Sequence, residues 1–322
     1  MNDQLSLRSK PVAVIGYGSI GQRHVRNLVH LGYGVDVVSA HGHVPQNLAN
    51  VIKLDHIDAD SHAFAVIANR NGSHIPTAIQ LASKGVHLLI EKPLSDTLDG
   101  TRDLVAIVQG NGITCRSAFV LRQHPCLRHA ESLLSSGVYG KLFGAWTVLG
   151  SYLPNWRPGV DHTSTTSAQA GVILDMAHEF DYLDRLLGPF IEVQAQAGVI
   201  SDLRTVEDWS DILYRTPRAM GSLHLDFLSR KTERKTRITL ETGSLVVDLI
   251  EHALTFENER GVSTLMRSDL DMNDLYLNML RDFERDIMTG EGGTADLCSG
   301  IRTLHAALTC RESARTGKRI AI

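Results

Sequence analysis

The stretch that decides the fold is Pro11-Val12-Ala13-Val14-Ile15-Gly16-Tyr17-Gly18-Ser19-Ile20-Gly21. Its apolar run predicts a buried strand, and the pattern G-x-G-x-x-G follows at once, ahead of a helix predicted to about Leu31. Gly16 permits a tight turn, Gly18 lets a pyrophosphate approach the backbone, and Gly21 lets helix and strand pack closely. In this context we expect a dinucleotide at the helix N-terminus rather than a tight turn without a ligand.

Strands and helices then alternate as far as residue 120. Further buried strands are predicted at 35–39, 63–68, 86–90 and 113–118, with helices at 74–84 and 97–108. This alternation is typical of right-handed βαβ units in a parallel sheet. We therefore predict an α/β fold whose dinucleotide-binding domain covers residues 1–121.

Polar residues follow several of these strands. In open parallel sheets, ligands bind beyond the carboxyl ends of the strands. Lys92, with Pro93 stiffening the turn behind it, can therefore direct its ammonium group at a substrate, although a solvated charge pair is the alternative. Asn69 also ends a strand and could bond the cofactor. His74 lies in the first turn of the next helix, either near the cofactor ribose or as an ordinary surface histidine.

The end of the second strand bears on the choice of cofactor. A carboxylate there would bind the ribose hydroxyls of NAD, but the chain has Ser39, Ala40 and His41 at this point, and Asp36 lies too early. Without that negative charge a 2′-phosphate is admissible, although no arginine stands ready to bind it. We predict NAD(P) as the cofactor and favour NADP.

The pattern changes at Leu121-Arg122-Gln123-His124-Pro125, so we predict a second domain over residues 122–322. Alternating segments such as Ser222-Leu223-His224-Leu225-Asp226-Phe227 suit an antiparallel sheet with one covered face. Strands are expected at 142–152, 193–200, 209–214, 220–227, 237–241, 245–249 and 253–256. Helices are expected at 127–136, 272–289 and 294–316.

A helix predicted over residues 171–183 carries two faces. An apolar stripe lies beside a polar face formed by Asp175, His178 and Tyr182, which are neighbours at spacings of three and seven. A carboxylate and an imidazole one turn apart can bind a hydroxyl group and exchange its proton. The alternative is a polar network that only orients the helix.

The loop at residues 152–162 is rich in groups that stack on sugars or grip anions. It includes Trp156 and Arg157 between two prolines. We favour a substrate lid over a purely structural loop.

The overall composition excludes several classes of function. The net charge is −4, and no basic cluster favours nucleic acid. No apolar run approaches the roughly 20 residues of a membrane span, and the N-terminus lacks a signal-peptide pattern. The four cysteines show no C-x-x-C spacing, and no histidine cluster has metal-ligand spacing. We expect a cytoplasmic protein with reduced thiols, no metal, and no nucleic-acid or membrane partner.

With these motifs placed, the chain resembles the Gfo/Idh/MocA oxidoreductase family over nearly its whole length. The resemblance rests on Gly16 to His24, on Glu91-Lys92-Pro93-Leu94, on Leu121 to Pro125, and on Gly171 to Glu179. It implies a Rossmann domain followed by an α/β domain with an open, largely antiparallel sheet. One face of that sheet commonly forms dimer or tetramer contacts in the family.

The resemblance also implies hydride transfer between nicotinamide and a carbon of a sugar or cyclitol. Lys92 would bond the reacting oxygen, His178 would be the acid–base group, and Asp175 would orient a hydroxyl group and the imidazole. The Lys92-Pro93 peptide bond is often cis in such proteins.

The chain departs from the common family pattern at two positions, and the first of them bears on the substrate. His178 follows Asp175 by three residues instead of four, as in a subgroup of surface-polysaccharide and acidic-sugar enzymes. Ala170 replaces a frequent glycine. We therefore expect a modified sugar, free or nucleotide-linked, with an anionic group near Arg157.

The predicted site thus has catalytic, cofactor-binding and substrate-binding members. The catalytic residues are Lys92, His178 and Asp175. The cofactor-binding residues are Gly16, Gly18, Ser19, Ile20, Gly21, Ser39, His41, Asn69, His74, Glu91 and Lys92. The substrate-binding residues are Lys92, Arg122, Trp156, Arg157, Asp175, His178 and Tyr182. Two other classes remain open: a catalytically silent NAD(P)-binding sensor, and a methyltransferase with the same glycine loop.

Overall fold

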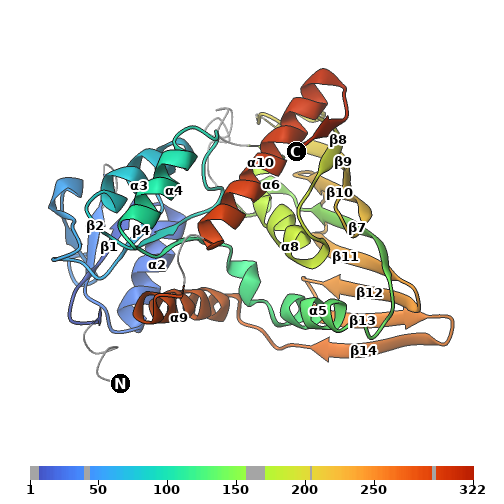
Figure 1. The fold of residues 1–322 in the computed structure, drawn as a ribbon, viewed down its shortest axis with the longest axis horizontal. Coiled ribbons are helices and arrows are strands. Elements are labelled where there is room, and N and C mark those ends of the chain that lie inside the picture. The colour runs from blue at the N-terminus through green and yellow to red at the C-terminus, as the bar shows by residue number, and fades with distance from the viewer. Residues whose placement is uncertain (1–6, 40–43, 157–170, 204, 292–294) are drawn as a thin grey trace. The chain divides into compact units, whose positions relative to one another are not determined.

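The structure is a computed structural model that describes residues 7–39, 44–156, 171–203, 205–291 and 295–322. The chain forms two compact units (Figure 1). Unit 1 combines Met1–Val120 with Met272–Ile301, and unit 2 combines Leu121–Asp271 with Arg302–Ile322. The sequence prediction also divided the chain near residue 121 but assigned everything after that point to the second domain. The structure instead returns residues 272–301 to unit 1.

Unit 1 is built on a six-stranded parallel sheet in the order β3-β2-β1-β4-β5-β6. The apolar runs predict central strands buried on both faces, and β1, β4 and β5 are fully buried. The order reverses at β1, so a topological switch point lies beside the glycine loop. The strands are β1 (Val12–Ile15), β2 (Val35–Val38), β3 (Asn50–Val51), β4 (Ala65–Ile67), β5 (Leu88–Ile90) and β6 (Cys115–Ser117).

The helices of unit 1 include one from late in the chain. They are α2 (Ser19–His30), α3 (His74–Ala82), α4 (Thr101–Gly110) and α9 (Met272–Thr289), with short 3₁₀ turns at Leu54–His56 and Asn71–Ser73. In α9, the buried Glu284 carboxylate accepts bonds from Arg8 Nε at 2.8 Å and Tyr33 Oη at 2.9 Å. Phe283 packs edge-on against Phe64, with the ring centroids 5.3 Å apart. These long-range contacts are why α9 belongs to unit 1.

Unit 2 contains a nine-stranded sheet in the order β14-β13-β12-β11-β7-β10-β9-β8-β15 (Figure 1). Only the neighbours β7 and β10 run parallel, so the predicted open and largely antiparallel sheet is confirmed. The strands are β7 (Leu142–Gly150), β8 (Glu192–Gly198), β9 (Trp209–Arg215), β10 (Met220–Asp226), β11 (Glu233–Leu240), β12 (Gly243–Asp248), β13 (Ala253–Asn258), β14 (Gly261–Arg267) and β15 (Ile320–Ala321).

Helices cover one face of this sheet. They are α5 (Pro125–Ser136), α6 (Leu153–Trp156), α7 (Val172–Asp175), α8 (Ala177–Leu187) and the part of α10 (Ala295–Thr316) from Arg302 onward, and a 3₁₀ turn at Val120–Gln123 precedes α5. Helix α5 contacts β12, β13 and α8, while α7 contacts β9 and β10. The other face leaves Trp146, Leu213 and Met220 exposed.

Several details differ from the sequence prediction, and they include the two short strands β3 and β15, which were not expected. The expected helix over residues 171–183 is broken at Met176, which has φ −95° and ψ 29°, into α7 and α8. Strand β14 was not expected, because its mostly exposed residues give weak alternation. Among the described residues, no helix is both long and apolar enough to cross a membrane.

Candidate active site

The glycine loop after β1 is shaped by its three motif glycines. Gly16 has φ +105°, and a Cβ there would collide with the carbonyl oxygen of Ala68 at the end of β4. A Cβ on Gly21 would collide with the carbonyl oxygen of Gly16. A Cβ on Gly18 would meet no described atom within 4 Å. Gly16 and Gly21 therefore serve packing, whereas Gly18 keeps an open space beside the backbone.

That open space lies at the start of α2. Gly18 is the N-cap of α2, no side chain caps the helix within the described structure, and no acid occupies its first turn. The first N–H groups and the positive end of the helix dipole thus suit an anion, as a dinucleotide pyrophosphate requires. Ser19, Ile20 and Gly21 supply these N–H groups. The loop fits a dinucleotide.

The end of β4 carries Asn69 and the start of α3. The Asn69 amide donates to Thr77 Oγ1 at 3.0 Å, and its buried Oδ1 has no hydrogen-bond partner within the described ranges. His74 is 1% exposed, and both its ring nitrogens face backbone carbonyls, those of Pro93 at 3.0 Å and Asn69 at 3.1 Å. Burial lowers the pKa of His74, although these carbonyls oppose the shift. The ring therefore links two loops at this edge of the sheet.

The end of β5 carries Glu91 and Lys92. Glu91 is buried, and its Oε1 lies 2.7 Å from His24 Nε2 of α2. Its Oε2 accepts the N–H of Lys92 at 3.1 Å, so both carboxylate oxygens bond protein groups. Lys92 is partly exposed, and the Lys92-Pro93 peptide bond is cis. The lysine thus follows β5 in the same sheet whose strand β1 leads into the glycine loop.

Ser39 follows β2 and is the last described residue before residues 40–43, which the structure does not describe and which include His41. The carboxylate of Asp36, inside β2, accepts a bond from Asn50 Nδ2 at 3.0 Å and lies 3.2 Å from His62 Nε2. These partners lie inside unit 1, so the only carboxylate on this strand is held within the protein.

In unit 2, Asp175 is buried at the end of α7, and His178 is partly exposed in the first turn of α8. Two ion pairs hold these helices. Glu207 Oε1 accepts the N–H of Ile173 at 3.2 Å and a bond from Arg311 Nη2 at 2.7 Å. Burial raises the pKa of Glu207, and Arg311 opposes that shift.

The second pair holds α8. The carboxylate of Glu179, which is 0% exposed, accepts two bonds from Arg234 of β11, at 2.7 and 2.9 Å. Since Glu179 follows His178 directly, this pair fixes the helical turn that carries the imidazole.

Two other predicted substrate residues have partners inside unit 2. Arg122 donates to the buried Asp181, with Nε 2.9 Å from Oδ2. Burial raises the pKa of Asp181, although Arg122 opposes the shift. Tyr182 is 2% exposed, and its hydroxyl lies 3.0 Å from Thr236 Oγ1. Trp156 ends α6, and Arg157 lies outside the described residues.

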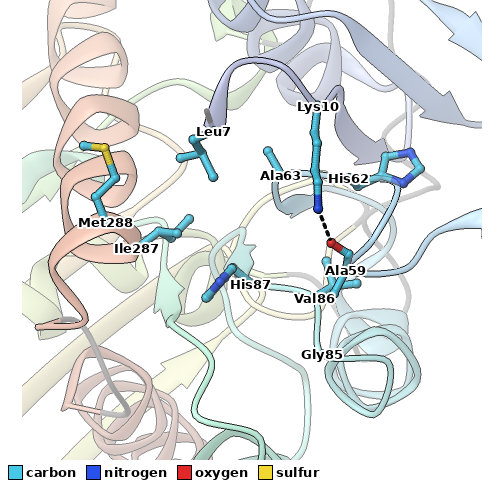
Figure 2. Close-up of a pocket in the computed structure, with 10 residues that line it drawn as sticks. All are labelled: Leu7, Lys10, Ala59, His62, Ala63, Gly85, Val86, His87, Ile287 and Met288. Carbon is cyan, nitrogen blue, oxygen red and sulfur yellow. Dashed lines mark hydrogen bonds between the residues drawn. The ribbon is translucent and has the colours of Figure 1, made fainter. Parts of the chain in front are cut away.

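Unit 1 also has a pocket of about 310 Å³ at the opposite edge of its sheet (Figure 2). Three of its lining residues lie at the amino ends of strands, because Lys10 precedes β1, His62 precedes β4 and His87 precedes β5. Lys10 Nζ donates to the carbonyl of Ala59 at 2.8 Å. The glycine loop and Lys92 follow the carboxyl ends of the same strands, so this pocket is not the dinucleotide site.

Sequence reasoning gave His24 no role, although it is 0% exposed and bonded to Glu91. One signal was present: His24 lies three residues after Gly21 and four before the buried Leu28, on the covered face of the helix. Its partner is 67 residues away in the chain, and helical spacing gives no indication of such a pairing.

Two family models match most of the chain. Residues 10–119 match an oxidoreductase family with an NAD-binding Rossmann fold, and residues 127–246 match the GFO/IDH/MocA C-terminal domain.

Individual relatives share about a quarter or less of their residues with this chain. A 1,5-anhydro-D-fructose reductase of Ensifer adhaerens is 25% identical over 284 residues, which are 81% of this chain and 82% of that protein. A D-xylose 1-dehydrogenase (NADP(+)) of Haloferax volcanii is 26% identical over 256 residues, which are 77% of this chain and 76% of that protein. A solved levoglucosan dehydrogenase in complex with NADH has a similar fold, with TM-score 0.85 at 18% identity, covering 97% of this chain and 99% of that one.

Proposed function

The chain belongs to the Gfo/Idh/MocA family of NAD(P)-dependent oxidoreductases, and on that premise we propose that it oxidises or reduces a sugar derivative. The reaction would interconvert a secondary alcohol and a ketone. The observation that carries the proposal lies within unit 1: a glycine loop open at Gly18 follows β1, and Lys92 follows β5 of the same sheet. The relatives named for sugar reduction or oxidation support this class of substrate.

The cofactor supplies the hydride acceptor or donor when it is bound. The N–H groups of Gly18, Ser19, Ile20 and Gly21 would hold its phosphates. The buried Asn69 Oδ1 would accept a bond from a hydroxyl group of the cofactor. Asp36, the one carboxylate of β2, lies inside the strand and not at its carboxyl end, so it does not oppose a 2′-phosphate, and we favour NADP over NAD.

In the proposed mechanism, the side-chain nitrogen of Lys92 bonds the reacting oxygen. On oxidation, Lys92 begins as the neutral amine, and the hydroxyl proton passes to that amine or to the neutral imidazole of His178, and from there to solvent. On reduction, the ammonium group or the imidazolium returns the proton to the oxygen. Asp175 would orient a substrate hydroxyl and the imidazole.

We further propose a modified sugar, free or nucleotide-linked, as the substrate. Trp156 would stack on a sugar ring, and Arg157 would bind an anionic group. Arg122 and Tyr182 already bond Asp181 and Thr236, so their contribution would be to shape the wall of the substrate site.

The open face of the unit 2 sheet supports a homodimer or homotetramer, and a cytoplasmic location remains our expectation from the sequence. Trp146 and Leu213 lie in one row across the sheet, because Ser222 is the register partner of both. They are 48% and 60% exposed, and Met220 on the same face is 68% exposed. Apolar surface of this kind favours contact with a second copy.

Replacing Lys92 by Ala tests the proposal. Turnover would be measured with NAD⁺ and NADP⁺ over a panel of aldoses, anhydrosugars, cyclitols, uronates and nucleotide sugars. Lys92→Ala should lower kcat about 10²- to 10⁴-fold while NADPH affinity stays within about threefold. Lys318→Ala, at an exposed lysine of unit 2, is the control and should change neither.

Two outcomes would contradict the proposal. Full turnover in Lys92→Ala would remove the lysine from the mechanism. Tight cofactor binding with no turnover on any panel member would favour the alternative of a catalytically silent sensor.

A further inference from the structure

Lys92 stands on a backbone segment that buried side chains hold on both sides. On the upstream side, Glu91 Oε2 accepts the N–H of Lys92 at 3.1 Å. The other oxygen of that carboxylate lies 2.7 Å from His24 Nε2, and the His24 side chain is 0% exposed. The His24 and Tyr276 rings lie nearly perpendicular, with an interplanar angle of 76° and the ring centroids 6.1 Å apart. A chain of two hydrogen bonds therefore runs from α2 to the amide of Lys92.

On the downstream side, His74 holds the carbonyl of Pro93. Its Nδ1 lies 3.0 Å from that oxygen, and its Nε2 lies 3.1 Å from the carbonyl oxygen of Asn69. Both partners are acceptors, so a neutral ring can donate to only one of them and an imidazolium to both. An imidazolium, or a neutral ring protonated at Nδ1, bonds the Pro93 carbonyl and so joins the start of α3 to the loop after β5.

We propose that His24 and His74 are positioning residues that fix the backbone of Glu91–Leu94 and so aim the side chain of Lys92. The proposal rests on the function proposed above for Lys92. Both histidines come from helices that begin at the dinucleotide edge, because α2 starts at the glycine loop and α3 starts after Asn69. The helices that border the cofactor thereby also set the place of the lysine.

The His62–Asp36 pair of unit 1 serves as a control, because it distinguishes the positioning of Lys92 from the general effect of losing a buried histidine–carboxylate pair. His62 is 5% exposed and lies 3.2 Å from the carboxylate of Asp36, much as His24 pairs with Glu91. His62 stands at the amino ends of the strands, in the lining of the pocket at that edge (Figure 2), whereas Lys92 follows a carboxyl end. His62→Leu removes a buried histidine–carboxylate pair without touching the segment that carries Lys92.

The first measurement is hydrogen exchange of the backbone amides of Glu91, Lys92 and Leu94, read by mass spectrometry, which needs no substrate. Glu91→Met removes both bonds without leaving a carboxylate buried, and Glu91→Gln keeps an oxygen for the Lys92 amide. We expect exchange of the Lys92 amide to rise about tenfold or more in Glu91→Met and His24→Leu. His74→Leu should accelerate exchange at Leu94. Glu91→Gln and His62→Leu should match the wild type at these amides.

The second measurement is the rate of hydride transfer with the best substrate of the panel, with its deuterated form as the isotope probe. Glu91→Met and His24→Leu should lower kcat by about 10²-fold, with NADPH affinity within about threefold and a larger isotope effect on kcat. Glu91→Gln should restore most of kcat, and His62→Leu should leave it unchanged.

Either of two results would overturn the positioning role: unchanged exchange at residues 91–94 in Glu91→Met, or equal effects of His24→Leu and His62→Leu on exchange there. Exchange that responds as expected, in a protein that turns over no panel substrate, would sustain the positioning of Lys92 and refute only the proposed reaction.

Discussion

At the scale of single residues, the glycines of the dinucleotide loop separate packing from binding. A methyl group on Gly21 collides with the backbone of Gly16, so Gly21→Ala should destabilise the loop itself. Gly18 has φ −71°, and a methyl group there meets no described atom within 4 Å. A substitution at Gly18 should therefore change the affinity for a bound ligand and leave the stability of the protein unchanged.

We predict that Gly18→Ala weakens NADPH binding about tenfold or more, a loss of about 1.4 kcal/mol, while the melting temperature stays close to that of the wild type. Fluorescence titration and differential scanning fluorimetry measure the two quantities. Gly110→Ala, where a Cβ in α4 is also free of described atoms within 4 Å, is the control and should bind NADPH normally. Unchanged affinity in Gly18→Ala would argue against phosphates at this loop.

Residue identities at the site were only partly predictable from the sequence. The glycines and Lys92 stand out because their roles depend on neighbours in the chain and on a strand end. The partners of Glu91 and His74 could not be foreseen, because His24 lies 67 residues from Glu91 and Pro93 lies 19 residues from His74. Pairings of that kind are set by how the sheet assembles.

At the scale of elements, the break between α7 and α8 shows where periodicity stops being informative. Residues 171–183 carry one continuous apolar stripe, which predicts a single helix. The structure holds the two halves by different anchors, Glu207 with Arg311 and Glu179 with Arg234. These partners lie on distant elements, so the break is visible only in three dimensions.

We predict that Arg234→Met destabilises unit 2 by about 3–5 kcal/mol, because it leaves the buried Glu179 carboxylate without its cation. The shift of the urea midpoint measures this loss. Arg237→Met is the control on the same strand, since Arg237 and Glu257 are 43% and 29% exposed. That pair should contribute less than about 1 kcal/mol. Equal shifts in the two variants would contradict the assigned role of the buried pair.

The contacts of His224 with Asp211 and Asp226 should make the stability of unit 2 depend on pH. His224 of β10 lies 2.7 Å from Asp211 Oδ1 and 3.1 Å from Asp226 Oδ2, and these bonds raise the pKa of His224. A raised histidine pKa adds stability that is complete below the unfolded value near 6.5 and is lost as pH rises through the folded value. The pKa of Asp226 is lowered, so this carboxylate changes the stability only in the acid range, where it becomes protonated.

The melting temperature of the wild type should therefore fall between about pH 6 and pH 9, and His224→Gln should flatten that fall. Thermal melts across this range measure the effect. His305→Gln, at an exposed histidine of α10, should retain the wild-type profile. A His224→Gln profile parallel to the wild type would mean that the pair does not govern this range.

At the scale of the whole molecule, the fold class and the two sheets followed from the sequence because strand–helix alternation and strand-only alternation are long and regular. The division of the chain did not follow, because the return of Met272–Ile301 to unit 1 depends on contacts such as that of Glu284 with Arg8. No local pattern in residues 272–301 indicates which sheet they cover.

We predict that Leu213→Glu converts a dimer or tetramer into a monomer, because it places a charge in the row of exposed apolar side chains on the unit 2 sheet. Light scattering after size exclusion measures the mass. Val138→Glu, at another exposed apolar residue outside the sheet, should leave the assembly unchanged. An unchanged mass for Leu213→Glu would exclude this face as the contact.

The chain passes from one unit to the other at Val120–Leu121, again at Asp271–Met272, and again within α10 at Ile301–Arg302. Neither unit is therefore formed by one continuous stretch of the sequence. A fragment ended at residue 121 would lack Phe283 and Glu284 and would expose the apolar surface around Phe64 that they cover. Exchange of unit 1 between relatives must therefore carry both of its segments, Met1–Val120 and Met272–Ile301, because a chimaera made with one crossover would pair Phe64 with a foreign α9.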